Sequence, residues 1–292
     1  MSGFAADWLA LREPADARAR NPLIGEALAG WLGARPRLRV LDLGAGTGAN
    51  LRYLAPHLEC DQDWLLCDHD PKLLEKLAPA LLAWADKAGH AARRQRDGLL
   101  IEGRGFRCRV RWVQAELTDG VASAWLGDAD LVTASALLDL VSSTWLDALI
   151  RGCRRPRVAL LFSLSYDGRI SWQPAVAGDG QVTAGLNRHQ RQDKGFGPAL
   201  GPIAAQYAAD ALCDNDFALV RARSDWRLGP SEGALQARLA ADWAQVLAEL
   251  EPAAADWLGS WLQSRSVWRA AGRSRLRVGH HDLFAVPRGW GS

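Results

Sequence analysis

The chain has 292 residues, of which 49% are hydrophobic, so one large domain can bury a core without disulfide support. Its formal net charge of +2 gives no overall field that would favour nucleic acid or a membrane surface. The five cysteines, an odd number without a C-x-x-C pair, argue against a disulfide framework and a cysteine-based zinc site. The sequence has no leader-like start and no apolar stretch of bilayer length, so we expect a cytoplasmic protein without a membrane partner.

The first half of the chain alternates between strand-like and helix-like patterns. A helical segment over residues 4–33 is expected to be broken by Pro14 and Pro22. A basic stretch over residues 87–104 resembles a loop, and the charged alternation that follows it is typical of a strand at a sheet edge. The expected strands are 38–43, 64–67, 107–113, 129–134 and 158–164. With helices between them, this order predicts a mostly parallel, doubly wound sheet.

After the fifth expected strand the pattern changes. Residues 166–198 are polar and rich in glycine, which indicates an insertion rather than a further strand-helix unit. The remaining expected elements are a helix at 202–213, a strand at 217–222, helices at 231–250 and 253–271, and a final strand at 276–286.

A glycine loop directly follows the first expected strand. Gly44, Gly46 and Gly48 allow a tight turn and a close ligand approach, and the helix after them presents free backbone N–H groups. Asp68 ends the next strand, where a carboxylate can accept both hydroxyl hydrogens of a ribose. The loop also fits the dinucleotide pattern through Gly44, Gly46 and Ala49, so a nicotinamide cofactor is an alternative.

Residues 38–166 resemble the core of class I S-adenosylmethionine-dependent methyltransferases. The run from Val40 to Gly48 (VLDLGAGTG) is similar to that family's first motif. The resemblance implies an α/β fold with a Rossmann-like doubly wound sheet of seven strands, the last antiparallel, and S-adenosylmethionine as cofactor. The implied cofactor-binding residues follow the first four strands: Asp42, Gly44, Ala45, Gly46, Gly48, Asp68, His69, Glu116, Leu117 and Ser135.

Within this resemblance the residues take different roles. The glycine loop lies against the methionine part of the cofactor, and Asp68 holds the ribose. Glu116, where the family usually has Asp, binds the adenine amino group. We expect Asp42 to orient the loop through its backbone amides, and Arg18 or Arg20 to pair with the cofactor carboxylate.

The chain is then a single methyltransferase domain with four parts. These are an N-terminal helical cap at 1–34, a cofactor-binding core at 35–165, an insertion at 166–216 that forms an acceptor lid, and the last two strands with their helices at 217–292. The cap, the loop after the fourth strand and the insertion are expected to enclose a small-molecule acceptor.

The chemistry needs little from the protein, because a sulfonium methyl group is already activated and mainly requires alignment with its acceptor. Two residues are candidate general bases: Asp139, just past the fourth strand, and His189, within the insertion. No metal is expected, since the spacing of His189, Asp193 and residues 280–282 matches no metal-binding pattern. Adjacent His280 and His281 should face opposite sides of their strand.

Two other functions remain open at this point. The arginines of residues 87–111 could follow an RNA backbone, which would make the chain an RNA methyltransferase. The Asp/Asn-Pro-Pro-Tyr motif of enzymes that methylate exocyclic amines of DNA bases is absent after the fourth strand, and the balanced charge disfavours nucleic acid in general. A non-catalytic cofactor-binding or scaffold protein is the other alternative.

Overall fold

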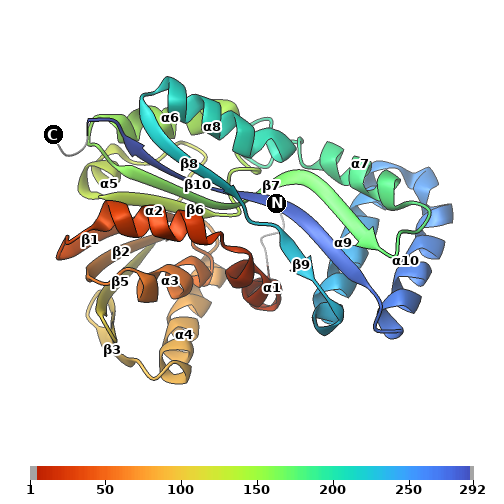
Figure 1. Cartoon of the computed structure of the whole chain (residues 1–292), viewed down its shortest axis with the longest axis horizontal. Helices are drawn as coiled ribbons and strands as arrows, with labels where there is room; N and C mark the ends of the chain where they lie inside the picture. The colour runs from red at the N-terminus through yellow and green to blue at the C-terminus, as the bar shows by residue number, and fades with distance from the viewer. Residues whose placement is uncertain (1–4, 290–292) are drawn as a thin grey trace.

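The computed structural model describes residues 5–289, in which one sheet runs through the whole molecule (Figure 1). Its strands are β1 Arg37–Leu43, β2 Asp61–Asp68, β3 Ala91–Gln95, β4 Gly98–Gly103, β5 Phe106–Gln114, β6 Leu131–Ser135, β7 Ala159–Gln173, β8 Phe217–Arg223, β9 Trp226–Leu228 and β10 Arg275–Pro287. The strand order is β3-β4-β5-β2-β1-β6-β7-β10-β8, and β9 pairs with β10.

This order confirms the predicted fold. Strands β5, β2, β1, β6 and β7 are parallel, and β10 lies antiparallel between β7 and β8. The seven strands from β5 to β8 therefore form the Rossmann-like sheet of class I methyltransferases, enlarged by β3, β4 and β9. From β1 the chain first adds strands on one side, toward β2 and β5, and then on the other side, toward β6 and β7, so the strand order reverses between β1 and β6. Ligands of such sheets bind at this point, at the carboxyl ends of the strands.

The basic stretch was predicted incorrectly. Residues 91–103 form the hairpin β3–β4 rather than a loop, and β5 lies between β2 and β4 rather than at the edge. Arginines dominate the composition there, but Leu99 and Ile101 are fully buried on alternate positions of β4, as a strand with one covered face requires. The sheet edge is β3 instead.

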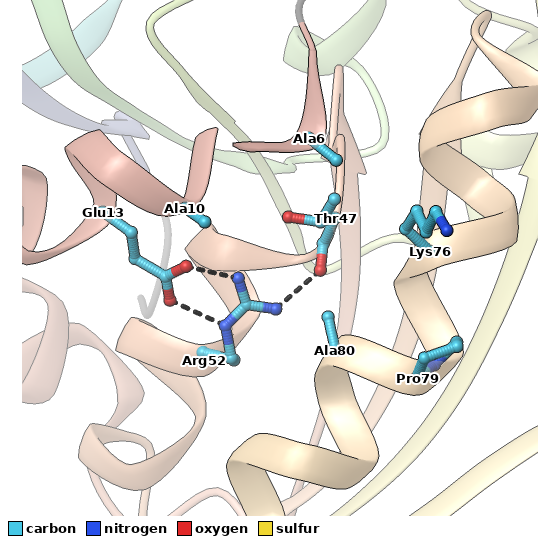
Figure 2. Close-up of a pocket in the computed structure, with 8 residues that line it drawn as sticks. All are labelled: Ala6, Ala10, Glu13, Thr47, Arg52, Lys76, Pro79 and Ala80. Carbon is cyan, nitrogen blue, oxygen red and sulfur yellow. Dashed lines mark hydrogen bonds and ion pairs between the residues drawn. The ribbon is translucent and has the colours of Figure 1, made fainter. Parts of the chain in front are cut away.

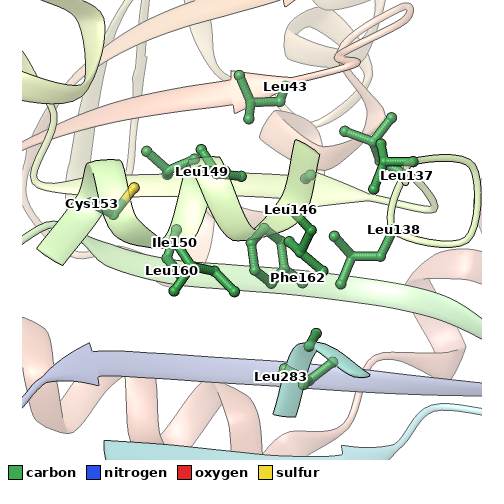
Figure 3. Packing of buried hydrophobic residues seen from close by; sticks show 14 of the residues in the cluster. Leu43, Leu137, Leu138, Leu146, Leu149, Ile150, Cys153, Leu160, Phe162 and Leu283 are labelled. Atoms are coloured by element: carbon green, nitrogen blue, oxygen red, sulfur yellow. The ribbon is translucent and has the colours of Figure 1, made fainter. Parts of the chain in front are cut away.

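Helices cover both faces of the sheet. Their bounds are α1 Ala6–Ala19, α2 Pro22–Leu32, α3 Ala49–Leu54, α4 Pro71–Lys87, α5 Ser123–Asp128, α6 Ser143–Arg154, α7 Asp179–His189, α8 Ala204–Asp214, α9 Gly233–Leu250 and α10 Ala255–Ala270. One apolar core joins the sheet to α2, α3 and α4, and a second joins its other face to α5, α6 and α8. Figure 3 shows part of the second core, where Phe162 of β7 and Ile150 of α6 are fully buried.

Strands β7 and β10 are unusually long and continue beyond the other strands into a second group of elements (Figure 1). This part has a third apolar core, in which Trp172 of β7 packs against Trp243 of α9 and Trp261 of α10. Residues 166–173, predicted as the start of the insertion, are therefore strand. Their polar residues hid the pattern because this part of the ribbon carries ion pairs, including Arg169 with Asp167.

The N-terminal segment lies between the two parts. Helix α1 continues through Pro14, whose ring is exposed, so the expected break there is wrong. The break expected at Pro22 is confirmed, because α2 begins at this residue, and the Asn21 side chain caps it by accepting a hydrogen bond from Leu23 N. None of the helices within residues 5–289 has the length and apolar character needed to cross a bilayer.

Candidate functional site

The glycine loop between β1 and α3 has the backbone that its sequence predicts. Gly44, Gly46 and Gly48 have φ values of +67°, +55° and +84°, which side chains with a Cβ rarely adopt. A Cβ on Gly46 would also come within 3.0 Å of the Leu9 side chain of α1. The loop is thus a left-handed turn at the carboxyl end of β1, and α1 lies directly over it.

Asp68 fastens this loop to the end of β2. Its buried carboxylate accepts a hydrogen bond from Gly46 N at 2.7 Å with Oδ2 and from Asp70 N at 2.9 Å with Oδ1. Asp70 itself caps α4 through Lys72 N. A carboxylate has about four lone-pair positions, so Asp68 still has acceptor capacity for ligand hydroxyls. The half-exposed His69 ring lies 3.5 Å from the same carboxylate.

Asp42 has a different partner from the one expected. Its Oδ1 accepts from Asn50 Nδ2 at 2.9 Å rather than from loop amides, and that Nδ2 also donates to Thr133 Oγ1 at 3.1 Å. The role of holding a loop amide belongs to Asp68. Burial raises the pKa of Asp42 to about 7, although the Asn50 hydrogen bond and the charge of Arg20 both act to lower it.

The two arginines proposed for the cofactor carboxylate point in different directions. Arg18 is exposed and pairs with Glu232 at 2.7 Å. Arg20 enters the protein, where its Nη2 donates to Asn50 Oδ1 at 2.9 Å and to Ser135 Oγ at 3.1 Å. Its guanidinium lies over the Tyr53 ring, with 5.0 Å from Cζ to the ring centroid. Ser135, at the end of β6, is thereby linked through Arg20 to Asn50 of α3.

The other predicted cofactor residues lie around the same edge. Ala45 is buried and its N–H donates to Cys67 O at 3.0 Å. The segment after β5 is joined to Asp68 because Ala115 N donates to its carbonyl at 2.9 Å. In this segment Glu116 is exposed, whereas Leu117 is buried in the core under α6. Glu116 is therefore available to a ligand, and Leu117 contributes packing.

Helix α1 is attached over the loop by charged groups. Figure 2 shows Arg52 donating to both carboxylate oxygens of Glu13, at 2.7 and 2.5 Å, and to Thr47 O at 2.6 Å. A cavity of about 440 Å³ lies between α1, Thr47 and α4, with Lys76 on its rim. Helix α1 thus lies over one side of the loop.

The candidate bases Asp139 and His189 both lie near Lys194. Burial raises the pKa of Asp139 to about 6, while the nearby charges of Arg12 and Lys194 lower it, and its Oδ1 has no partner within residues 5–289. His189 ends α7, and its Nε2 lies 3.1 Å from Lys194 Nζ. Burial and the charge of Lys194 lower the pKa of His189. Asp139 is buried, whereas His189 is partly exposed.

A polar cluster under α1 contains residues that the sequence did not identify as candidate bases or cofactor ligands. Arg12 pairs with Asp16 at 2.9 Å and lies over the Trp226 ring, 5.0 Å from its centroid. The His280 ring lies 5.1 Å from that of Trp226 and 6.2 Å from that of Tyr166. Burial, together with Arg12, lowers the pKa of His280 to about 4, so this ring is neutral at pH 7.

The spacing of polar residues in α1 could have indicated part of this cluster. Arg12, Asp16 and Arg20 are spaced four residues apart, which places polar side chains on one face of α1, and that face is turned inward. His281 faces the other side of β10, as expected, with its Nε2 at 3.4 Å from Asp167. Across the described part of the chain, no group of three or more His, Cys, Asp or Glu side chains could hold a metal ion.

Comparison with known proteins finds similarity in structure only. No family model and no curated protein matches the sequence. The chain is similar to the cyclopropane synthase MmaA2 from Mycobacterium tuberculosis (12% identity, TM-score 0.48, 97% of this chain and 94% of that one). It is also similar to the YcgJ protein from Bacillus subtilis (12% identity, TM-score 0.49, 92% of this chain and 99% of that one). A third similar structure is an S-adenosylmethionine-dependent methyltransferase from Geobacter sulfurreducens, in complex with S-adenosylhomocysteine (16% identity, TM-score 0.43, 97% of this chain and 99% of that one). At these values the likenesses carry no argument about function, and the fold rests on the strand order.

The attachment of α1 can be tested by removing one carboxylate. Glu13→Gln leaves the Arg52 guanidinium, whose side chain is 8% exposed, without its anionic partner. With Glu13 partly exposed, we expect a loss of about 1–2 kcal/mol, or roughly 2–6 °C in Tm. Hydrogen exchange measured by mass spectrometry should also increase in residues 6–19. Asp242→Asn, which breaks the exposed Arg238–Asp242 pair in α9, is the control and should change neither quantity. Equal effects of the two variants would show that α1 is held by other contacts.

Proposed function

We propose that the chain binds S-adenosylmethionine and transfers its methyl group to a small-molecule acceptor. The observation that carries this proposal is the direct hydrogen bond from Gly46 of the loop to the buried carboxylate of Asp68. It joins the loop after β1 to the acid after β2 at the carboxyl edge of the sheet, beside the point where the strand order reverses. Loop backbone and ribose-binding acid are thereby next to each other, as a nucleoside ligand requires.

The charges around the loop favour this cofactor over a dinucleotide. Asp42 and Asp68 are both buried at the carboxyl ends of β1 and β2, so the loop carries two acidic groups close behind it. An acid in the place of Asp68 is compatible with either ligand, so Asp42 makes the difference. Its pKa of about 7 leaves it partly ionised at pH 7, and a carboxylate directly before the loop repels a pyrophosphate, whereas it attracts a sulfonium or an ammonium group. In the proposed complex, Asp68 accepts from the ribose hydroxyls, the loop lies against the methionine part, and Glu116 is the acceptor for the adenine amino group.

Asp139 and His189, near the polar cluster under α1, are the candidate general bases of the reaction. When bound, the cofactor supplies an activated methyl group, so the protein must position the acceptor and keep water out. Asp139 accepts the acceptor's proton at Oδ1, because its pKa of about 6 leaves it ionised at pH 7 yet basic enough to act. His189 is the second candidate; the Lys194 ammonium, 3.1 Å from its Nε2, disfavours the protonated ring that a general base must form.

The burial of the side chains around Asp139 supports a small acceptor. Tyr166 is buried and donates through its hydroxyl to Asn187 Oδ1 at 2.7 Å, and His280 is also buried. On the sheet face near the hairpin, part of the arginine charge is neutralised, since Arg109 pairs with Asp63 and Arg107 with Glu102, each at 3.3 Å. An RNA-binding surface would leave such cations free for phosphates.

The cofactor site is tested by Asp68→Asn. This variant keeps an oxygen that can accept from Gly46 N but removes the charge that the ribose hydroxyls would meet. Hydrogen bonds to charged groups contribute about 1.5–3 kcal/mol, so we expect affinity for S-adenosylhomocysteine to fall about 10–100-fold in calorimetric titration. Asp63→Asn, on the same strand but near its other end, is the matched control and should bind normally. Normal binding by Asp68→Asn would contradict the site assignment.

The role of Asp139 is tested by methyl transfer from labelled cofactor into fractionated metabolites and RNA. We expect a labelled small molecule, and a transfer rate that falls as the pH drops through about 6, where Asp139 takes up a proton. Asp139→Asn should reduce the rate about 10²–10⁴-fold and remove this pH dependence, while S-adenosylhomocysteine affinity stays unchanged. If His189→Gln causes that loss instead, the two roles are exchanged. Labelled RNA, or no labelled product, would support one of the alternative functions.

A further inference from the structure

The Lys194 ammonium, near Asp139, has no anionic partner. In the described part of the chain it forms no ion pair with a carboxylate, and its only hydrogen-bond partner is the His189 ring, 3.1 Å away at Nε2. A neutral imidazole does not balance the charge, and burial lowers the pKa of both groups. The other nearby cation, Arg12, is engaged with Asp16 at 2.9 Å. Lys194 therefore keeps its capacity to bind an anion.

The loop that carries Lys194 is held next to Asp139 by backbone hydrogen bonds. Gly201 N donates to Asp139 O at 3.0 Å, so the end of the insertion runs beside the segment that follows β6. Asp193 Oδ1 accepts from Gly195 N at 2.7 Å, which closes a turn around Lys194. The cation is thus carried by an ordered turn that the fold places near the candidate base.

Two buried side chains of the same region have atoms without a hydrogen-bond partner. Among residues 5–289, nothing bonds to Asp139 Oδ1 or to His280 Nδ1, and the two residues are only 6% and 5% exposed. Buried polar atoms without a partner are costly, so they indicate a position that a ligand fills. Asp139 and Lys194 affect each other's pKa but form no ion pair, so a ligand can meet each group separately.

These groups match an acceptor that carries a carboxylate besides its nucleophilic group. An ammonium donates strongly to a carboxylate, and Asp139 can accept the proton of a hydroxyl or an amine. A phosphate monoester, with a charge of about −1.5 to −2 at pH 7, would require a second available cation, and Arg12 is engaged with Asp16. We propose that the acceptor is a small carboxylic acid, whose carboxylate binds Lys194 while its hydroxyl or amine donates to Asp139.

This inference rests on the proposed function and names the class of its acceptor. The acceptor's oxygen or nitrogen forms a bond to the methyl carbon as the bond from that carbon to sulfur breaks, and the sulfur keeps the electron pair. The proton of the hydroxyl or amine passes to Asp139. The carboxylate on Lys194 takes no part in the transfer, so the methylated product is still an acid. Lys194 thus determines which acceptor binds and moves no proton.

The test uses labelled S-adenosylmethionine and a metabolite extract treated in two ways. Conversion of carboxyl groups to methylamides with a carbodiimide should abolish labelling of small molecules by the wild-type chain, whereas phosphatase treatment should not. With the acceptor purified from that extract, Lys194→Gln should raise KM about 10–100-fold and change kcat less than about 3-fold, because the lost contact binds substrate and transition state alike. Lys194→Arg should recover part of the loss. Arg191→Gln, which removes an exposed cation nearby in the sequence, is the matched control and should leave both constants unchanged.

The possible outcomes separate this inference from the function on which it rests. No labelled small molecule from the untreated extract would contradict the proposed function, and the inference with it. Labelling that survives the carbodiimide, or that is lost after phosphatase treatment, would overturn only the inference. An unchanged KM in Lys194→Gln would do the same, as would a loss confined to kcat, which would mean that Lys194 acts through His189. Lys194→Gln should keep the wild-type Tm and affinity for S-adenosylhomocysteine, and a loss of either would overturn the assignment of Lys194 to the acceptor.

Discussion

The site depends on one buried hydrogen bond, between the N–H of Gly46 and the carboxylate of Asp68. The bond crosses from the end of β1 to the end of β2, and it is possible only because Gly46 takes a left-handed backbone. Because both strands are covered on their two faces by packed helices, the atoms that it joins are fixed in position. The adjacent features follow from this anchor: the turn that begins α3, the approach of α1 over the loop, and the attachment of the segment after β5.

Around this anchor the chain buries several charges, and their arrangement is what gives the edge of the sheet its chemical character. Asn50 lies between Arg20 and Asp42 and forms hydrogen bonds with both. In the other cluster, Lys194 lies 3.1 Å from His189, and its charge lowers the pKa of Asp139. Within residues 5–289, Arg20, Asp42 and Asp139 have buried side-chain atoms without a hydrogen-bond partner. Sites that bind and react commonly keep such unsatisfied groups at some cost in stability. In the proposed function, the first cluster serves the cofactor and the second the acceptor.

The sequence predicted those parts of the fold that depend on local patterns. The loop from Gly44 to Gly48 and the short apolar strands are local features, and the strand order follows from their alternation with helices. The prediction from sequence failed where burial matters more than composition. The arginine-rich residues 91–103 were expected to form a loop, but they form the hairpin β3–β4, in which Leu99 and Ile101 are buried. The polar cluster under α1 could be predicted only in part. The four-residue spacing of Arg12 and Asp16 indicates a polar face of α1, but His280 lies far along the chain and comes near Arg12 only through the packing of α1 over the sheet. The orphaned atoms of Arg20 likewise depend on three-dimensional packing.

The central claim is that the loop and Asp68 form a site for a methyl donor and not for a dinucleotide. It is tested most directly by calorimetric titration of the unmodified chain with S-adenosylhomocysteine and, separately, with NADPH. The account predicts one S-adenosylhomocysteine bound per chain, with a Kd on the order of micromolar or below, and no measurable heat with NADPH. Saturable binding of NADPH, or no binding of S-adenosylhomocysteine at millimolar concentrations, would contradict it.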